Sequence, residues 1–204
     1  MSSITLKHSG GNSVSIAAPS SNPASNRTIT LPSTADGTML TTTNPKVGNI
    51  IQVVQTYKKD AFSESVGAQN ASSVCMSCAI TPSSSSSKIL IQVVAHISSS
   101  SATNLVGINL DKNGTEHTAS MADTDGNRIR TASANGNERN YYVSPCIVNF
   151  IDEPATTSSI TYGVRIRSSS GGTQTLKLNR TSADDNNQNN LIPCSSITIY
   201  EVAA

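Results

Sequence analysis

The stretch KILIQVVAHIS, residues 88–98, decides the fold class of this chain. It is dominated by Ile, Val and Leu, and β-branched residues are enriched in strands. A second stretch, SITYGVRIR at 159–167, alternates with period two, so that Ile160, Tyr162, Val164 and Ile166 share one side. Both stretches therefore predict β-strands, and nothing near them has sustained helical periodicity.

The same reasoning extends to the rest of the chain after Pro45. Asn113-Gly114 predicts a hairpin turn, and Pro145 predicts an edge strand or a bulge. About eight strands joined by polar turns favour an all-β, jelly-roll-like β-sandwich head at residues 47–204. The remaining expected strands are 49–57, 73–81, 104–112, 141–151, 175–179 and 196–202.

Two strands, IIQVV at 50–54 and LIQVV at 90–94, are apolar on both faces and nearly identical. The simplest interpretation of their similarity is that they are neighbouring central strands. A strand of a monomeric two-layer sandwich needs only one buried face. We therefore expect the second apolar face to be buried against a neighbouring subunit, which predicts an oligomer.

Residues 1–46 differ from the head, because short β-like pieces alternate with turn signals and large apolar residues are few. Such a segment buries too little surface to offset its own ordering entropy. It is either disordered or ordered against other chains, and regular strand pieces favour the second alternative. We expect an extended β docking or stalk segment at 1–46, with docking residues Ile29, Leu31, Met39 and Leu40.

Composition and charge exclude several classes of protein. Charged residues make up 13% of the chain, the net charge is +1, and no basic stripe is interleaved with aromatics, so nucleic acid is not an expected partner. No apolar run reaches the roughly 20 residues that span a bilayer, and no signal peptide precedes the first strand. Cys75 and Cys78 lack zinc partners at suitable spacing and are expected to be buried thiols.

No set of residues predicts catalysis, a cofactor or a metal. The chain lacks a G-x-S-x-G elbow, and Asp152 and Glu153 are adjacent on an extended chain and point apart. His96 is expected to be a packed or interface histidine. The stretch 123–127 resembles part of a calcium loop but fails its spacing in either register. We therefore expect the protein not to be an enzyme.

Two long polar loops, 111–140 and 179–190, are the places where surface recognition would occur. If the head binds a host surface glycan, charged and aromatic side chains of the first loop would contact it. The alternative is that both loops only keep the head soluble. The candidate contact residues are Arg128, Arg130, Arg139, Tyr141 and Tyr142.

A family resemblance is carried by TITLP at 28–32 and DGTML at 36–40. Together they resemble a signature of tail-fibre and virion structural proteins, particularly those of marine and cyanobacterial phages. The pieces 48–55, 80–82, 88–91 and 196–202 resemble the head domains that follow this signature. The resemblance touches most of the chain, but only in short pieces.

The resemblance implies a homotrimer with an N-terminal docking or stalk segment and a distal jelly-roll knob. Because this chain has almost no shaft, a short capsid fibre or a knob docked on a larger tail component fits better than a long tail fibre. The protein would be assembled in the host cytoplasm and located in the virion, with other tail or capsid proteins as partners. Alternatives are a receptor-binding adhesin for host glycans and a polysaccharide-degrading enzyme.

Overall fold

The structure is a computed structural model that describes residues 3–17, 20–21, 45–100, 105–136, 142–183, 185–188 and 190–204. Its contacts divide the chain into two units, residues 1–39 and 40–204. The predicted docking residues Ile29, Leu31, Met39 and Leu40 lie outside the described residues. In the described ranges, no helix is long and apolar enough to cross a membrane.

The N-terminal unit contains an antiparallel hairpin of β1 (Ser3–Lys7) and β2 (Ser13–Ala17). Ile4 pairs with Ile16, and these two side chains and Leu6 are exposed. On the other side of the ribbon the hydroxyls of Thr5 and Ser15 lie 2.9 Å apart. A two-stranded hairpin with no packed face is marginally stable in water. The apolar side of this hairpin therefore needs a partner surface.

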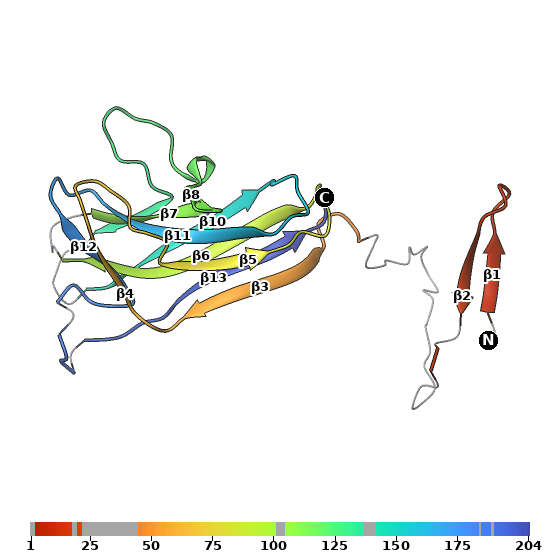
Figure 1. Cartoon of the computed structure of the whole chain (residues 1–204), viewed down its shortest axis with the longest axis horizontal. Helices are drawn as coiled ribbons and strands as arrows, with labels where there is room; N and C mark the ends of the chain where they lie inside the picture. Colours follow the sequence, from red (N-terminus) through yellow and green to blue (C-terminus); the bar gives the residue numbers. More distant parts are fainter. Residues whose placement is uncertain are drawn as a thin grey trace, which may run out of the picture. The chain divides into compact units, whose positions relative to one another are not determined.

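The head begins its first strand at Ile50 and ends its last at Val202 (Figure 1). One short 3₁₀ turn, η1 (Thr118–Ser120), interrupts the strands. The strands of the head are β3 (Ile50–Lys58), β4 (Phe62–Val66), β5 (Met76–Ile80), β6 (Lys88–Ser99), β7 (Leu105–Lys112), β8 (Thr115–Glu116), β9 (Ser133–Gly136), β10 (Ser144–Asp152), β11 (Ile160–Ser168), β12 (Gln174–Leu178) and β13 (Ser195–Val202).

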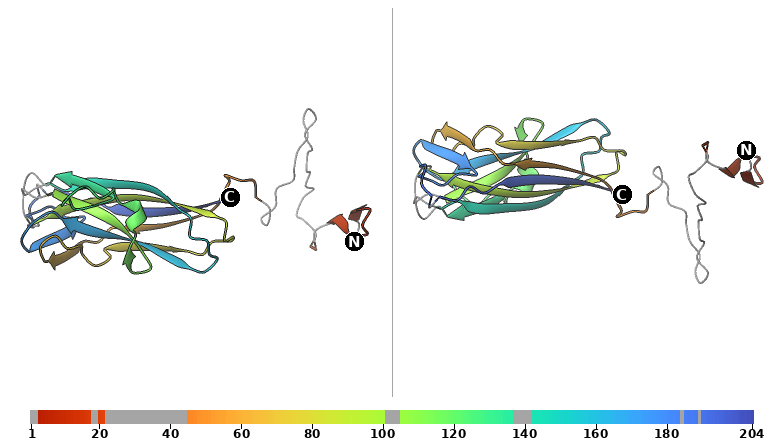
Figure 2. Two further views of the ribbon diagram at one scale, coloured as in Figure 1. Left: turned by 90° about the horizontal axis from the view of Figure 1, so that it is seen from above. Right: turned by 90° about the horizontal axis from the view of Figure 1, so that it is seen from below.

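The head strands form two antiparallel sheets (Figures 1 and 2). In the six-stranded sheet the order is β3–β13–β6–β10, and β12 pairs with the end of β6 and carries β4. In the five-stranded sheet the order is β5–β11–β7, with β8 and β9 both paired to β7. Most consecutive strands alternate between the sheets, which is the wrapping of a jelly roll. The head is a jelly-roll-like β-sandwich.

The core between the sheets is built almost wholly from aliphatic side chains. Tyr162 is the largest fully buried side chain, and it points inward from β11 with its i+2 and i+4 neighbours, as the alternation predicted. Each buried Val, Leu or Ile stabilises the fold by roughly 1.5–3 kcal/mol relative to exposure. The fully buried aliphatic residues include Ile89, Ile91, Val93, Ile97, Ile108, Leu110, Val164, Ile166, Leu176, Leu178, Ile197 and Ile199.

Most predicted strands are confirmed to within a few residues, but two expectations need correction. The similar stretches at 50–54 and 90–94 are not neighbours, because β13 pairs with β3 on one side and with β6 on the other. The strand expected from Ser73 begins at Met76, although Cys75 N still donates to Val164 O of β11, the strand that pairs with β5, at 2.9 Å. Pro145 lies in β10, which within the described chain pairs only with β6, as expected for an edge strand.

Candidate functional site

The outward-facing residues of β3, β13, β6 and β10 form a surface that we call the open face. The register of the four strands aligns their outward side chains in rows across the sheet. Two apolar-rich rows flank a polar row. The rows are Val53, Tyr200, Leu90 and Ile151; then Gln55, Thr198, Gln92 and Asn149; then Tyr57, Ser196, Val94 and Ile147.

Large apolar side chains of the open face are in contact with solvent in the single chain. Val53 and Tyr57 on β3 are each 53% exposed, and Ile147 and Ile151 on β10 are 56% and 55% exposed. Single exposed apolar residues are ordinary, whereas a contiguous apolar patch indicates an interaction surface. The apolar second face inferred from the sequence is therefore present, and it extends from β3 to β10.

The polar row gives the open face a defined register. The Gln55 amide Nε2 donates to Thr198 Oγ1 at 2.8 Å, across the β3–β13 pair. Amide side chains present both donors and acceptors, so a partner must match them as well as the apolar rows. His96 lies in the last third of β6 and its Nδ1 is 2.9 Å from Cys194 O, which fixes the ring at the border of this face.

The outer face of the five-stranded sheet, which we call the covered face, has the opposite chemistry. The Asp111 side chain is only 3% exposed and accepts from Arg165 Nε at 2.7 Å. The remaining donors of Arg165 bond to Ser72 O at 3.1 Å and Gly114 O at 3.0 Å. A buried carboxylate needs such partners, because an unpaired buried charge is costly.

A second group of charges continues along the covered face. Arg167 Nη2 lies 3.0 Å from Glu116 Oε2, and Asn109 Nδ2 donates to Glu116 Oε1 at 2.9 Å. Two glycines let other parts of the chain approach this face closely. A Cβ on Gly163 would lie 2.7 Å from Val74 Cγ1, and one on Gly107 would lie 2.7 Å from Ser133 O. The chain itself thus covers this face.

The loop 117–132, part of the long insert noted in the sequence, reaches this face at Gly107, where a Cβ would lie 2.9 Å from Thr131 Cγ2. Its ends bond to β7, with His117 N donating to Leu110 O and Ala132 N donating to Ile108 O. Arg130 joins its two arms, because Nε donates to Ala122 O at 2.5 Å and Nη2 to Thr118 O at 3.3 Å. Arg130, a predicted glycan contact, therefore holds the loop together.

An open groove of about 440 Å³ lies between the tip of this loop and the ends of β7 and β11. Arg128 lines the groove with its side chain 77% exposed, and it pairs with the equally exposed Asp125. Gln69, Leu105 and Arg167 also line it, and no sequence motif singled them out. Of the other predicted contacts, Tyr142 is exposed but is not among the residues that line the groove, whereas Arg139 and Tyr141 lie outside the described residues.

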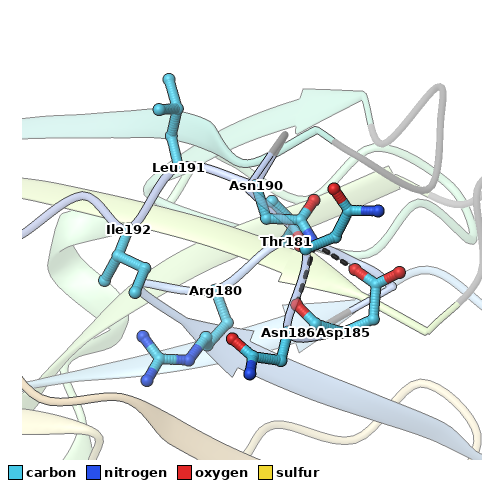
Figure 3. Close-up of a pocket in the computed structure, with 8 residues that line it drawn as sticks. Arg180, Thr181, Asp185, Asn186, Asn190, Leu191 and Ile192 are labelled. Carbon is cyan, nitrogen blue, oxygen red and sulfur yellow. Dashed lines mark hydrogen bonds between the residues drawn. The ribbon is translucent and has the colours of Figure 1, made fainter.

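The second polar loop encloses a smaller pocket of about 270 Å³ (Figure 3). Its polar groups bond to one another, since Asn190 Nδ2 donates to Asp185 O at 3.0 Å. Leu191 and Ile192 line the pocket and are strongly exposed. Asn179 fixes the base of the loop, because Nδ2 donates to Lys58 O and Asp60 O at 3.0 Å. This internal bonding is typical of a structured loop.

A buried polar cluster around Asp152 connects the two sheets. Asp152 Oδ2 accepts from Lys112 Nζ and from the Tyr162 hydroxyl, both at 2.5 Å, and His117 Nε2 lies 3.4 Å from Oδ1. Burial alone would raise the pKa of Asp152, but hydrogen bonds from Lys112 and Tyr162 hold it below its usual range. None of these residues lines the groove or the loop pocket, so the cluster links β10 to β7 and β11.

Comparisons with known proteins give only distant likenesses. No family model matches the chain, and no curated protein matches it. Solved structures with a similar backbone include the infectious bursal disease virus Gx strain, with a TM-score of 0.41 and 16% identity over 95% of this chain and 44% of that chain. Another is the VP2 subviral particle of the same virus, with a TM-score of 0.37 and 16% identity over 94% and 47%.

The chain spans less than half the length of those viral chains. The assignment of the head as a jelly roll therefore depends on its own strand order and register.

Proposed function

We propose that the protein is a non-enzymatic structural component of a virion, a short tail or capsid fibre or knob. Its head forms a homotrimer through the open face, and its N-terminal segment docks on other virion proteins. The observation that carries the proposal is the open face. Its large apolar side chains are exposed, whereas the outer face of the other sheet is covered by the chain itself.

Burial of the open face would supply the energy of assembly. Val53, Tyr57, Ile147 and Ile151 are each more than half exposed in the single chain. Removing apolar surface from water is worth roughly 25 cal/mol per Å². The polar row between the apolar rows adds register, since unmatched amides would be penalised on burial. A second copy of this chain supplies matching apolar and amide groups.

A threefold arrangement uses the two halves of the open face differently. Contacts around a threefold axis are heterologous, so each copy offers one patch to one neighbour and a different patch to the other. The β3 half, with Val53 and Tyr57, would meet the β10 half, with Ile147 and Ile151, of the next copy. The trimer itself is what the phage-fibre resemblance implies.

The N-terminal hairpin supports a docking role for the first part of the chain. Ile4, Leu6 and Ile16 are exposed and need a partner surface, as described above. Strand addition to another virion protein would satisfy both the hairpin edges and this apolar side. The predicted docking residues in TITLP and DGTML continue the same segment.

Sedimentation equilibrium of the full chain tests the assembly. We expect three times the protomer mass, and we expect the variant Val53→Lys/Ile147→Lys to sediment as a folded monomer. The matched control is Ser77→Lys/Ala79→Lys, which places two lysines at exposed positions of β5 on the other sheet. The control should remain trimeric. A wild-type monomer at micromolar concentration, or a trimeric Val53→Lys/Ile147→Lys variant, contradicts the proposal.

The virion role is tested separately, by searching purified particles for the chain. Deletion of residues 1–45 should give a soluble head that no longer joins particles. Incorporation of this truncated head would contradict docking through the N-terminal segment, whatever the result for the trimer.

A further inference from the structure

We propose that the groove beside Arg128 is a binding site for a saccharide that carries a carboxylate. The groove lies on the five-stranded sheet, whereas the proposed trimer contact lies on the six-stranded sheet. The site goes beyond the proposed structural role and deepens the adhesin alternative, because it names the ligand and the residues. Its test is independent of the trimer.

The charge of the groove favours an anion. Arg128 and Arg167 line it, and the described residues of its lining include no Asp or Glu. Arg167 is half-buried and paired to Glu116, so Arg128 is the guanidinium that solvent reaches. Among the described residues Arg128 forms an ion pair with Asp125, which is 73% exposed, and exposed ion pairs are worth little. A ligand carboxylate can replace Asp125 and bind the planar guanidinium through two hydrogen bonds.

Gln69 provides a second, independent observation. Its φ is 57°, in the left-handed region that a residue with a Cβ rarely adopts. Its backbone N–H donates to Ser170 O at 3.0 Å, which holds this conformation, and the residue is one of those that line the groove. Strained residues of this kind concentrate at binding sites. The amide offers a donor and an acceptor, which is what sugar hydroxyls require.

The apolar part of the groove suits the C–H face of a sugar ring. Leu105 is 59% exposed and lies in the groove with the half-buried Ile129. Asn127 and Ser169 place further polar groups along the lining. An inorganic anion would use only the guanidinium. A ligand that fits the whole groove needs an apolar face for the aliphatic side chains, hydroxyls for the amide and a negative charge for the guanidinium. A saccharide with a carboxylate has all three.

A ligand-observed NMR titration of the full chain tests the site with methyl β-glucuronide and methyl β-glucoside. The two probes share one ring and differ in a carboxylate against a hydroxymethyl group. We expect the glucuronide to bind, and the glucoside to bind at least about tenfold more weakly, because charge-assisted hydrogen bonds are the stronger ones. Binding of neither probe overturns the proposal, and equal binding of both overturns the assignment of the anion.

Two variants locate the binding. Arg128→Ala should weaken glucuronide binding by about tenfold or more. Gln69→Gly should weaken binding without loss of thermal stability, because glycine adopts this φ without strain. The matched control Lys46→Ala removes an exposed cation immediately before the head and should bind as wild type. Unchanged binding by both groove variants would place the ligand elsewhere and overturn the proposal.

Discussion

The two outer faces of the sandwich differ in how their side chains are satisfied. On the covered face, Asp111 and Glu116 are paired with Arg165 and Arg167, and carbonyl oxygens of the chain accept the other bonds of Arg165. On the open face, regular strands present Val53, Ile147 and Ile151 to solvent. Charges that are buried in the protomer need partners within the same protomer. An apolar face, in contrast, can stay exposed until a partner chain binds it. The comparison separates what stabilises the protomer from what assembles it.

The largest expected effect comes from breaking an ion pair of the covered face. Arg165→Met leaves the Asp111 carboxylate buried without its cation, and removing one partner of a buried pair typically costs about 3–5 kcal/mol of unfolding free energy. Denaturant unfolding monitored by circular dichroism measures the loss. Arg165→Met/Asp111→Leu should recover part of the stability. The exposed ion pair between Lys88 and Glu153 provides the control. Lys88→Met should lower the unfolding free energy by less than about 1 kcal/mol.

An intermediate effect is expected at the polar cluster that ties β10 to the five-stranded sheet. Asp152→Asn keeps the shape but weakens the bonds from Lys112 and Tyr162, at a cost of about 1–3 kcal/mol. The same denaturant titration measures it. Tyr162→Phe removes only one of the two donors and should cost less than Asp152→Asn. An equal or larger loss for Tyr162→Phe would show that the carboxylate is not the centre of this cluster.

Acid should weaken the same cluster. The pKa of Asp152 is lowered in the folded state, so its contribution to stability is fully present above its unfolded value and is lost as the pH falls through its folded value. The decline therefore begins near pH 4, the unfolded value of an aspartate, and continues below it. Thermal melts between neutral and acidic pH should converge for wild type and Asp152→Asn. Parallel curves at all pH values would contradict this.

The smallest effect on the protomer, and the most informative one, is expected at the open face. Ile151→Thr should change protomer stability by less than about 0.5 kcal/mol, because the residue is on the surface. If the open face assembles, the melting temperature of wild type should rise with protein concentration, and this rise should shrink in the variant. Melts over a hundredfold range of concentration measure it. A wild-type melting temperature independent of concentration would count against assembly.

The sequence predicted the architecture of the head well, because period-two alternation is a local signal. Ile160, Tyr162, Val164 and Ile166 are buried as alternation required, and Pro145 marks an edge strand. The prediction that the similar stretches 50–54 and 90–94 are neighbouring strands was wrong. Both β3 and β6 pair with residues of β13 that lie more than 100 positions away in the sequence. Strand β4, FSESV, was missed because its only large apolar residues are at its two ends.

The two surfaces were predictable to different degrees. The open face follows from strands that are apolar on both sides, which the sequence displays directly. The groove does not, because Gln69, Leu105 and Arg167 come from three distant segments without a shared pattern. Arg128, which lines the groove, was singled out in the sequence by its place in a long charged loop, and its role as a contact stays a prediction. Arg130 came from the same loop, and only the structure shows that it donates to carbonyls of that loop.

The position of β13 has a consequence for synthesis. This strand, at 195–202, lies between β3 and β6, so the six-stranded sheet has an open slot until the ribosome has passed residue 202. A nascent chain can pair β6 with β10 earlier, but it cannot align the rows that run from β3 to β10. Prematurely terminated chains would therefore lack the surface that the proposed assembly uses.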